Sequence, residues 1–267
     1  MDLVDFSNER FEAVKKDAQK WLESVGIVPI LYVPISAIKG DNIAAKSEKM
    51  DWYTGPTFLE SLDTLQNRQP PENKSLLFPI QDVYKIGDKR ISVGRVESGA
   101  IAKGDEIKIL PTGQVTKIKT IEKFLEDIDK ADAGECIGIT TADSVYLSRG
   151  QVVCLPGTEP TLTDSINANI FWMTKTGVDK GQTLTIRCAT QETSCKIANI
   201  NKRINSSTLE LIEKDATVLN NLEVGEVVIK TKKPLAITSF NDVQEMGRFV
   251  LVREENICAG GIITNQK

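Results

Sequence analysis

The first quarter of the chain alternates between a helical pattern and a continuous apolar one. In FSNERFEAVKKDAQKWLESVG (residues 6–26), apolar side chains recur at helical spacing, and Ser7 is placed to cap the helix. IVPILYVPIS (residues 27–36) is almost wholly apolar, which predicts a strand buried on both faces of a parallel sheet. GPTFLESLDTL (residues 55–65) predicts a second, short amphipathic helix. Together these patterns predict the rear part of a doubly wound α/β domain.

The pattern changes after a proline-rich polar stretch, QNRQPPENKS, which predicts a linker between domains. From Leu76 onward, short β-rich runs are separated by Gly, Pro and Asp turns every ten or so residues, as in antiparallel barrels or sandwiches. A second β-rich unit follows a junction within Gly150–Thr163. The expected segments are therefore an α/β part (1–68), a linker (69–75), a first β domain (76–157) and a second β domain (158–267).

A hairpin is predicted at TIRCATQETSCKI (residues 185–197). A turn at Gln191-Glu192 would set Cys188 opposite Cys195, close enough for a bridge to be considered. Two reduced thiols are the alternative, which a reducing compartment favours. The five cysteines show no CxxC spacing, so the sequence predicts neither a zinc site nor a disulfide framework.

Composition narrows the possible chemistry. The chain has no histidine, which removes imidazole bases, imidazole-activated nucleophiles and imidazole metal ligands. A net charge of −4 argues against non-specific nucleic-acid binding, and the low aromatic content argues against a stacking platform for single strands. No apolar run is long enough to span a membrane and no signal peptide is evident, so we expect a cytoplasmic protein without membrane contact.

Two short motifs have chemical potential. An Asp just after a strand can accept two hydrogen bonds from an amide-and-amine edge, which is the pattern that guanine presents, and Asp2 is the candidate. SAIKG (residues 36–40) follows the apolar run and would lie at the carboxyl edge of a parallel sheet, where doubly wound domains bind ligands. No GxxxxGK[ST] phosphate loop is present; SGAIAKGDEI lies between β runs and predicts a turn.

The order of these features resembles the translation-factor class of GTPases, the group that contains elongation factor Tu. Asp2, a helix, an apolar run, SAIKGDN, SEKMDWYTGPTFLESLD and two β units follow one another as in that class. The resemblance implies an α/β remnant of a P-loop GTPase domain followed by two antiparallel β-barrels, like domains 2 and 3 of elongation factor Tu. In this class an Asn-Lys-x-Asp motif reads guanine. Met1 and Asp2 would be its last two residues, with Ser36, Ala37 and Ile38 lining the base pocket.

The resemblance also implies which groups lie outside this sequence. The phosphate loop, the switch regions and the magnesium ligands would lie upstream of Met1, so GTP and Mg²⁺ are expected in a full-length parent and not in this chain. No catalytic residue and no metal ligand is assigned within the chain, and we expect no GTP hydrolysis by it. The apolar run 27–36 would lack its sheet neighbours, so we expect residues 1–68 to pack on the barrels, to self-associate or to be loosely held.

Two members of this class are alternatives. One is the GTP-hydrolysing large subunit of sulfate adenylyltransferase, which AAKSEKMDWY, SRGQVVC, NANIFWM, INSSTLE and the absence of histidine favour. Its implied partner is the small catalytic subunit, and no nucleic acid is expected. The other is a translation elongation factor of the Tu/1-alpha type that delivers aminoacyl-tRNA. The stretches FPIQDVYKI and ISVGRVESGAIAKGDEI resemble this group about as well as they resemble the first. The first alternative is the preferred interpretation of the sequence.

Overall fold

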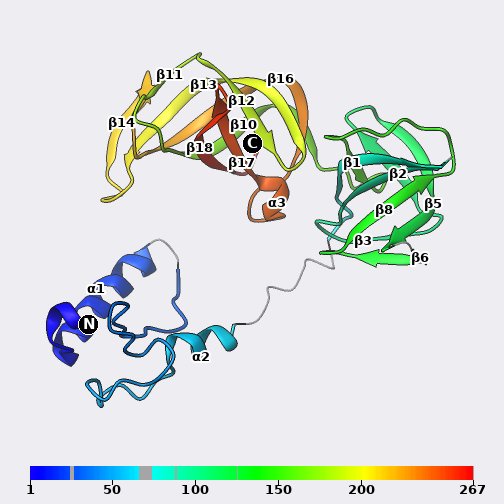
Figure 1. Cartoon of the computed structure of the whole chain (residues 1–267). Helices are drawn as coiled ribbons and strands as arrows, with labels where there is room; N and C mark the ends of the chain where they lie inside the picture. Colours follow the sequence, from blue (N-terminus) through cyan, green and yellow to red (C-terminus); the bar gives the residue numbers. More distant parts are fainter. Residues whose placement is uncertain (25–26, 66–73, 88, 125, 267) are drawn as a thin grey trace. The chain divides into compact units, whose positions relative to one another are not determined.

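The computed structural model describes residues 1–24, 27–65, 74–87, 89–124 and 126–266, and the chain divides into two compact units, Met1–Arg68 and Gln69–Lys267 (Figure 1). In the described ranges the helices are η1 (Asp2–Val4), α1 (Asn8–Ser24), α2 (Phe58–Asp63) and α3 (Gln244–Gly247). The strands of the first half are β1 (Phe78–Ile86), β2 (Lys89–Arg95), β3 (Ala100–Ala102), β4 (Glu106–Leu110), β5 (Gln114–Lys123), β6 (Glu126–Ile128), β7 (Lys130–Asp132), β8 (Cys136–Thr141) and β9 (Val152–Cys154). Those of the second half are β10 (Thr161–Trp172), β11 (Val178–Asp179), β12 (Thr183–Cys188), β13 (Gln191–Asn205), β14 (Leu211–Ala216), β15 (Val218–Leu219), β16 (Glu223–Ile237), β17 (Arg248–Arg253) and β18 (Asn256–Ile263).

Both helices predicted for the first unit are present, and each begins at a polar cap. The Ser7 hydroxyl accepts a hydrogen bond from the backbone N–H of Arg10 (3.3 Å) at the start of α1. At α2 the caps are reciprocal: Thr57 Oγ1 accepts the N–H of Glu60, and the Glu60 carboxylate accepts the N–H of Thr57 (2.7 Å). Such caps satisfy backbone donors that the helix itself leaves without partners, so the local sequence alone fixes where these helices begin.

The strand predicted at residues 27–36 is wrong. Ser36 alone forms a bridge, with Asp41, and the rest of this segment is extended backbone without ladder partners among the described residues. Val28 and Ile30 are 84% and 90% exposed. A parallel strand needs neighbouring strands for its hydrogen bonds and for the cover of its side chains, and the described part of this unit supplies none.

An aromatic cluster holds the first unit together instead. The rings of Phe11, on α1, and Trp52 lie 5.4 Å apart, and Trp52 Nε1 donates a hydrogen bond to the Phe6 carbonyl (3.1 Å). Met50 beside them is fully buried. The loop after Ser36 is therefore fixed to α1 by side-chain packing and not by a sheet.

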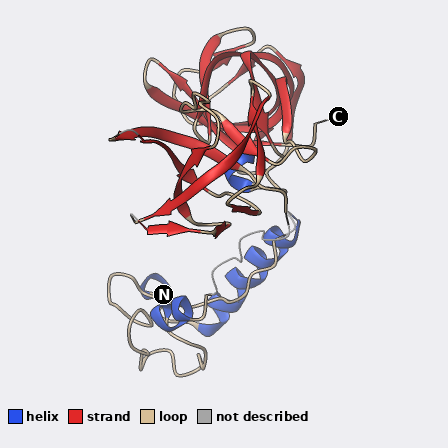
Figure 2. Ribbon diagram, turned by 90° about the vertical axis from the view of Figure 1, so that its right-hand side faces the viewer, coloured by secondary structure: helices blue, strands red, loops and turns tan. Residues whose placement is uncertain are grey.

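Figure 2 shows that strands make up most of the second compact unit. The first barrel, β1–β9, is a sheet in the order β4-β9-β1-β2-β8-β5-β6 in which β4 also pairs with β5. That extra pairing closes the sheet on itself and leaves β6 outside the ring, while β3 and β7 pair separately. The ladders within the sheet are antiparallel. Alternate residues point inward and form the core, which comprises Leu76, Phe78, Ile80, Val96, Ile101, Ile107, Ile109, Ile118, Ile121, Ala131, Ala133, Ile137, Ile139, Leu147 and Val153.

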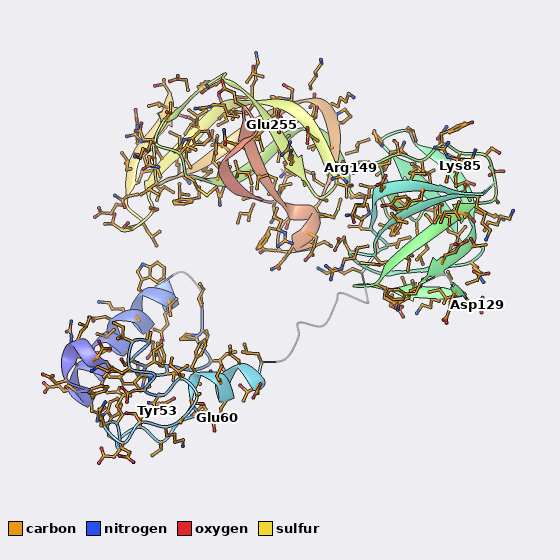
Figure 3. The ribbon with its side chains drawn as sticks, viewed as in Figure 1. Tyr53, Glu60, Lys85, Asp129, Arg149 and Glu255 are labelled. Atoms are coloured by element: carbon orange, nitrogen blue, oxygen red, sulfur yellow. The ribbon has the colours of Figure 1, made fainter. Side chains whose placement is uncertain are left out.

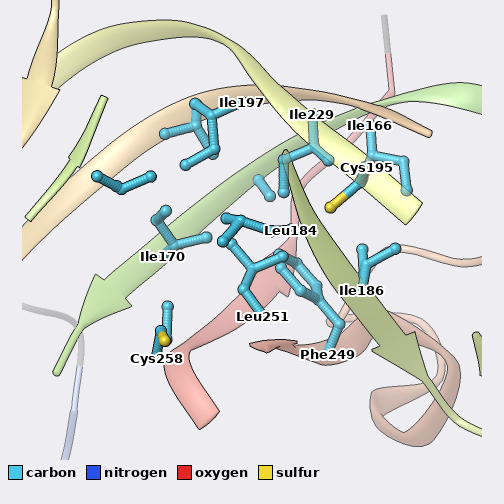
Figure 4. Close-up of a cluster of buried hydrophobic side chains, with 14 of the residues drawn as sticks. Ile166, Ile170, Leu184, Ile186, Cys195, Ile197, Ile229, Phe249, Leu251 and Cys258 are labelled. Carbon is cyan, nitrogen blue, oxygen red and sulfur yellow. The ribbon is translucent and has the colours of Figure 1, made fainter. Parts of the chain in front are cut away.

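The second barrel, β10–β18, repeats this design. Its sheet order is β12-β17-β18-β10-β16-β13-β14, and β12 also pairs with β13 to close the ring. Its core is an aliphatic cluster with Phe249 and Trp172, and Figure 4 shows Leu251, Ile186 and Ile170 converging in it. The predicted antiparallel barrels are thus both present, because the period-2 pattern of each strand places one row of apolar side chains inside a closed sheet.

The two barrels pack against each other within one compact unit. A shared apolar cluster joins Leu77 and Cys154 of the first barrel to Ala236 and Met246 of the second, and all of these side chains are buried. The Lys74 ammonium, ahead of β1, donates a hydrogen bond to the Asp242 carbonyl beside α3. These contacts fix the two barrels relative to each other, so a surface that both contribute to is a structural feature of the chain.

The predicted hairpin at residues 185–197 is present as β12 and β13, but its predicted register is wrong. Cys188 pairs with Gln191, and Cys195 pairs with Leu184, so the turn falls at Ala189-Thr190. Gln191 is buried because its side-chain amide pairs with both backbone groups of Ala236 (2.8 Å each), which makes it a strand residue. Cys188 and Cys195 are both free thiols.

Candidate functional site

Two of the predicted guanine-site residues are in direct contact. The Ser36 hydroxyl donates a hydrogen bond to Asp2 Oδ1 (2.5 Å), and the Met1 amino group donates one to the Ile35 carbonyl (2.7 Å). The hydrogen bond from Ser36 lowers the pKa of the Asp2 carboxyl from its usual value. Asp2 is therefore an oriented carboxylate beside the loop that begins at Ser36.

The loop is a tight turn. Gly40 N–H donates to the Ser36 carbonyl (2.8 Å), and Lys39 N–H donates to the Ser36 hydroxyl (3.3 Å). Below it, the buried Asn42 amide donates to the Pro34 carbonyl (3.0 Å). Ala37 and Ile38, at the tip of the turn, are exposed, Ile38 by 86%. Asp2 and Ser36 thus meet, whereas Ala37 and Ile38 point outward, and a guanine pocket at this loop stays a prediction.

A second candidate site, which we call the inter-barrel groove, lies between the two barrels. It is a hollow of about 470 Å³. Figure 3 labels Arg149 on the side of the first barrel that faces the second. The lining consists of Pro79, Gln81, Arg95, Glu97 and Arg149 from the first barrel and Arg187, Ala189, Thr190, Glu245, Arg248, Phe249 and Val250 from the second. Each barrel contributes two arginines and one glutamate, so the groove carries an excess of positive charge.

Hydrogen bonds to neutral backbone carbonyls orient the arginines of the first barrel. Arg149 Nη1 donates to the Gln81 carbonyl (2.9 Å), and Arg95 Nε donates to the Gly134 carbonyl (3.2 Å). A carbonyl fixes a guanidinium without neutralising it. Arg187 differs, because the Glu192 carboxylate accepts its Nε–H (2.7 Å) and raises its pKa. Of these three arginines, only Arg187 has its charge balanced by a hydrogen-bonded carboxylate.

Glu97 is the titratable group with the most distinctive environment in the groove. Partial burial raises the pKa of its carboxyl, Glu245 raises it further, and the nearby guanidinium groups of Arg95 and Arg248 oppose the shift. The groove therefore combines arginines with a carboxyl that is protonated more readily than usual. Phosphate groups match the planar, forked donors of arginine, and protonation of Glu97 would increase the attraction for them.

Sequence reasoning missed both this groove and the exposed aromatic rings of the first barrel. The groove combines residues 79–250, which only the packing of the two barrels brings together. Low aromatic content argued against stacking, yet Tyr84, Phe124 and Tyr146 of the first barrel are exposed by 52%, 90% and 75%. Three exposed rings on one small barrel can bind planar groups, which bulk composition cannot show.

No helix in the described ranges has the length and apolar character that crossing a membrane requires. The same residues contain no group of three or more His, Cys, Asp or Glu side chains placed to hold a metal ion. The chemistry of the candidate sites therefore has to be argued from guanidinium, hydroxyl, carboxylate and aromatic groups.

Comparison with known proteins matches each barrel to a known domain family. Residues 89–154 match the family model for Elongation factor Tu domain 2, and residues 165–264 match the GTP-eEF1A C-terminal domain-like family. Elongation factor 1-alpha of Methanopyrus kandleri is 34% identical over 94% of this chain and 63% of its own length. The Bifunctional enzyme NodQ of Rhizobium sp. is 31% identical over 94% of this chain and 39% of its own length.

Structural comparison agrees on the fold. The crystal structure of sup35 complexed with GDP aligns with a TM-score of 0.69, covering 98% of this chain and 66% of that one at 22% identity. The chain spans about three fifths of the length of the elongation factors that it matches, 63% for Methanopyrus kandleri and 58% for Desulfurococcus mucosus. The two predicted barrels, like domains 2 and 3 of elongation factor Tu, are confirmed, and the first unit keeps the helices of the predicted α/β remnant without its strand.

Proposed function

The chain belongs to the translation-factor class of the GTPase superfamily, and we propose that it is the C-terminal portion of a GTPase of the elongation factor 1-alpha type. In this proposal the two barrels bind an aminoacyl-tRNA. The observation that carries the proposal is the inter-barrel groove, because its arginines suit the phosphates of a nucleic-acid backbone. Similarity to elongation factor 1-alpha over nearly the whole chain supports the same interpretation.

The groove has the charge that a local phosphate site needs on an acidic protein. The net charge of −4 disfavours binding all over the surface, so any RNA contact has to be concentrated in one place. Arg149 is oriented there by a carbonyl oxygen, which fixes its guanidinium without neutralising it. This departs from the expectation drawn from the sequence, in which the preferred interpretation involved no nucleic acid.

The loop at Asp2 and Ser36 would serve guanine recognition in a longer parent protein. Its carboxylate is oriented by Ser36 and can accept hydrogen bonds from a base edge with amide and amine donors. GTP with Mg²⁺ would supply the phosphoryl chemistry in that parent, through groups that this sequence does not contain. The chain by itself is proposed to bind neither and to hydrolyse no GTP.

The experiment is a titration of the chain with aminoacyl-tRNA and with deacylated tRNA at low salt, followed by fluorescence anisotropy. The proposal expects saturable binding that weakens steeply with salt, since phosphate contacts release counterions. Double-stranded DNA of equal length serves as the control for general polyanion binding. Equal affinity for that DNA, or no binding of either tRNA, would contradict a tRNA-binding role.

A second candidate function is the large subunit of sulfate adenylyltransferase, which would couple GTP hydrolysis to adenylyl sulfate synthesis. The specific observations in its favour are the stretches AAKSEKMDWY, NANIFWM and INSSTLE and the absence of histidine. The match to a bifunctional enzyme supports an assignment outside translation. Calorimetric titration with the small catalytic subunit tests it: micromolar binding together with no tRNA binding would favour this candidate over the first.

A further inference from the structure

The first unit contains a groove of its own, which we call the aromatic groove. It has a volume of about 560 Å³, within the range of small-molecule sites. It lies between α1, the extended segment 30–32 and the turn at residues 52–55, and it shares no lining residue with the inter-barrel groove. Its lining includes four aromatic side chains and one oppositely charged pair: Phe11, Tyr32, Trp52, Tyr53, Glu12 and Lys15.

Hydrogen bonds from their polar ends hold two of these rings in place. Trp52 Nε1 donates to the Phe6 carbonyl (3.1 Å), and the Tyr53 hydroxyl donates to the Pro56 carbonyl (3.0 Å). The centroid of the Trp52 ring lies 5.4 Å from that of Phe11 and 6.3 Å from that of Tyr53. Rings held by such contacts are pre-organised, so little conformational entropy is lost when a ligand binds against them.

The position of Lys15 shows which charge the rings attract. Its Nζ lies 5.9 Å from the ring centroids of both Phe11 and Tyr32. Both carboxylate oxygens of Glu12 accept hydrogen bonds from the same ammonium (3.2 and 3.3 Å). A cation beside two ring faces is attracted by the negative face of each ring. The aromatic groove therefore has the parts of a cation site, namely ring faces and a carboxylate, and a side chain of the chain itself occupies it.

Burial does not lock Lys15 in this position. Its side chain is 35% exposed, and that of its partner Glu12 is 55% exposed. Exposed pairs of this kind on a helix stabilise it only slightly, because water and salt screen the two charges. A second cation can therefore displace the ammonium from the rings. The Glu12 carboxylate would then be the counter-charge of the newcomer.

The surroundings of the rings favour an alkylated cation. Ile30 and Leu31, exposed by 90% and 43%, add aliphatic surface to the lining. The Tyr32 hydroxyl oxygen is buried without a hydrogen-bond partner among the described residues, so it adds partial negative charge. A primary ammonium needs acceptors for three N–H donors, whereas a quaternary ammonium needs none and is attracted by ring faces. Rings, aliphatic groups and one carboxylate therefore suit a quaternary ammonium better.

We propose that the aromatic groove binds a quaternary ammonium ion against Phe11 and Tyr32, with Glu12 as its counter-charge and Lys15 as the internal competitor that it displaces. Two sources present such an ion, a free cation such as choline and the trimethylated lysine side chain of a partner protein. Both carry the same trimethylammonium group. The site is independent of the inter-barrel groove and of the tRNA-binding role proposed for it.

The test is calorimetric titration of the chain with choline and with dimethylbutanol, in which an uncharged carbon replaces the nitrogen of choline. We expect choline to bind with a dissociation constant of about 0.1–1 mM. Dimethylbutanol has the same shape without the charge, so it should bind roughly fivefold more weakly or not at all. Equal binding of the two compounds would overturn the proposal, because it would show an apolar groove without selectivity for a cation.

Variants of α1 and of the rings sharpen the test. Lys15→Met keeps the length of the side chain and removes the competing charge, so it should tighten choline binding roughly threefold to tenfold. Tyr32→Leu keeps apolar volume and removes one ring face, so it should weaken binding by a similar factor. The matched control is Lys16→Met, exposed on the same helix and outside the lining, which should leave binding unchanged.

Two peptides, one with trimethyl-lysine and one with unmodified lysine, separate the sources. Tighter binding of the trimethylated peptide than of choline would identify a partner side chain, and equal or weaker binding would identify a free cation. The proposal is overturned if the unmodified peptide binds as tightly as the trimethylated one. It is also overturned if Lys15→Met binds choline no more tightly than the wild-type chain. Such a failure leaves the tRNA proposal standing, because the two grooves share no residue.

Discussion

The hydroxyl of Ser36 donates a 2.5 Å hydrogen bond to the carboxylate of Asp2, across 34 positions of the sequence. This contact joins the first residues of the chain to the turn that follows the apolar segment. It also places an oriented carboxylate beside the exposed tip at Ala37 and Ile38. The arrangement persists although the described residues of this unit form no sheet around the segment before Ser36, so the contact does not depend on a sheet.

The first prediction concerns this contact. Ser36→Ala should raise the pKa of Asp2 toward the usual value for an aspartate, because the hydrogen bond from Ser36 is the main cause of its depression. Because the pKa of Asp2 is lower in the folded state than in the unfolded state, its carboxylate stabilises the folded unit at pH values above the unfolded-state pKa. This stabilisation is lost as the pH falls through the folded-state pKa. Carboxyl NMR titration measures the shift. Ser47→Ala, which removes a hydrogen bond to Asp41, is the control; an unchanged Asp2 pKa in Ser36→Ala would refute the assignment.

The second prediction concerns the cysteines. Burial raises the pKa of Cys188 and Cys195 to about 12 and that of Cys154 to about 11, so their thiolates are scarce at pH 8. Cys258 is buried as well, whereas Cys136 is exposed. Iodoacetamide followed by peptide mass mapping should modify Cys136 in the native protein and all five cysteines in denaturant. Rapid native labelling of Cys188 would show that the hairpin register is different.

The third prediction concerns the core of the second barrel. Leu251 is fully buried among Ile170, Ile186 and Phe249. Leu251→Ala should lower the free energy of unfolding by about 2–5 kcal/mol, because the barrel cannot collapse onto the cavity that remains. Chemical denaturation measures this, with the exposed Leu211 as the control: Leu211→Ala should change stability by no more than about 0.5 kcal/mol. Equal effects of the two variants would contradict the described core.

The fourth prediction concerns Glu97. Its folded-state pKa is raised, chiefly by burial, so the stability it contributes is complete at acid pH and is lost as the pH rises through that raised value. Glu97→Gln should therefore raise the melting temperature at pH 7.5 by about 2 °C and have no effect at pH 4. Glu135→Gln is the opposite case, because Lys123 lowers the pKa of Glu135, and it should lower the melting temperature at pH 7.5. A lower melting temperature for Glu97→Gln at pH 7.5 would mean that the carboxylate is stabilised by the arginines.

The sequence was informative where structure is decided locally. Ser7 marks the start of α1 in the sequence because capping depends on neighbouring residues. The barrels follow from alternating apolar positions, which depend only on the strand period. The strand prediction for residues 27–36 was wrong because a strand depends on distant partners. The apolar pattern is that of a buried strand, but the described residues of this unit supply no neighbouring strand.

The register of the β12–β13 hairpin and the lining of the inter-barrel groove could be determined only from the tertiary structure. Gln191 looked like a turn residue because it is polar, and only its pairing with Ala236 shows that it is a buried strand residue. Asp2 and Ser36 were found from the sequence because a family motif names them. The arginines of the inter-barrel groove belong to separate strands and loops, each with an ordinary local pattern. Nothing in the chain order shows that Arg95 and Arg187 line one hollow.

The central claim is that the inter-barrel groove binds RNA phosphates, and Arg149 offers the most direct test. The measurement is the salt dependence of aminoacyl-tRNA binding for the wild-type chain and Arg149→Ala, with the exposed Lys117, outside the groove, substituted to alanine as the control. The account predicts that Arg149→Ala weakens binding and lowers the slope of log K against log salt by about 1, while Lys117→Ala leaves that slope unchanged. Identical slopes for Arg149→Ala and the wild type would contradict it.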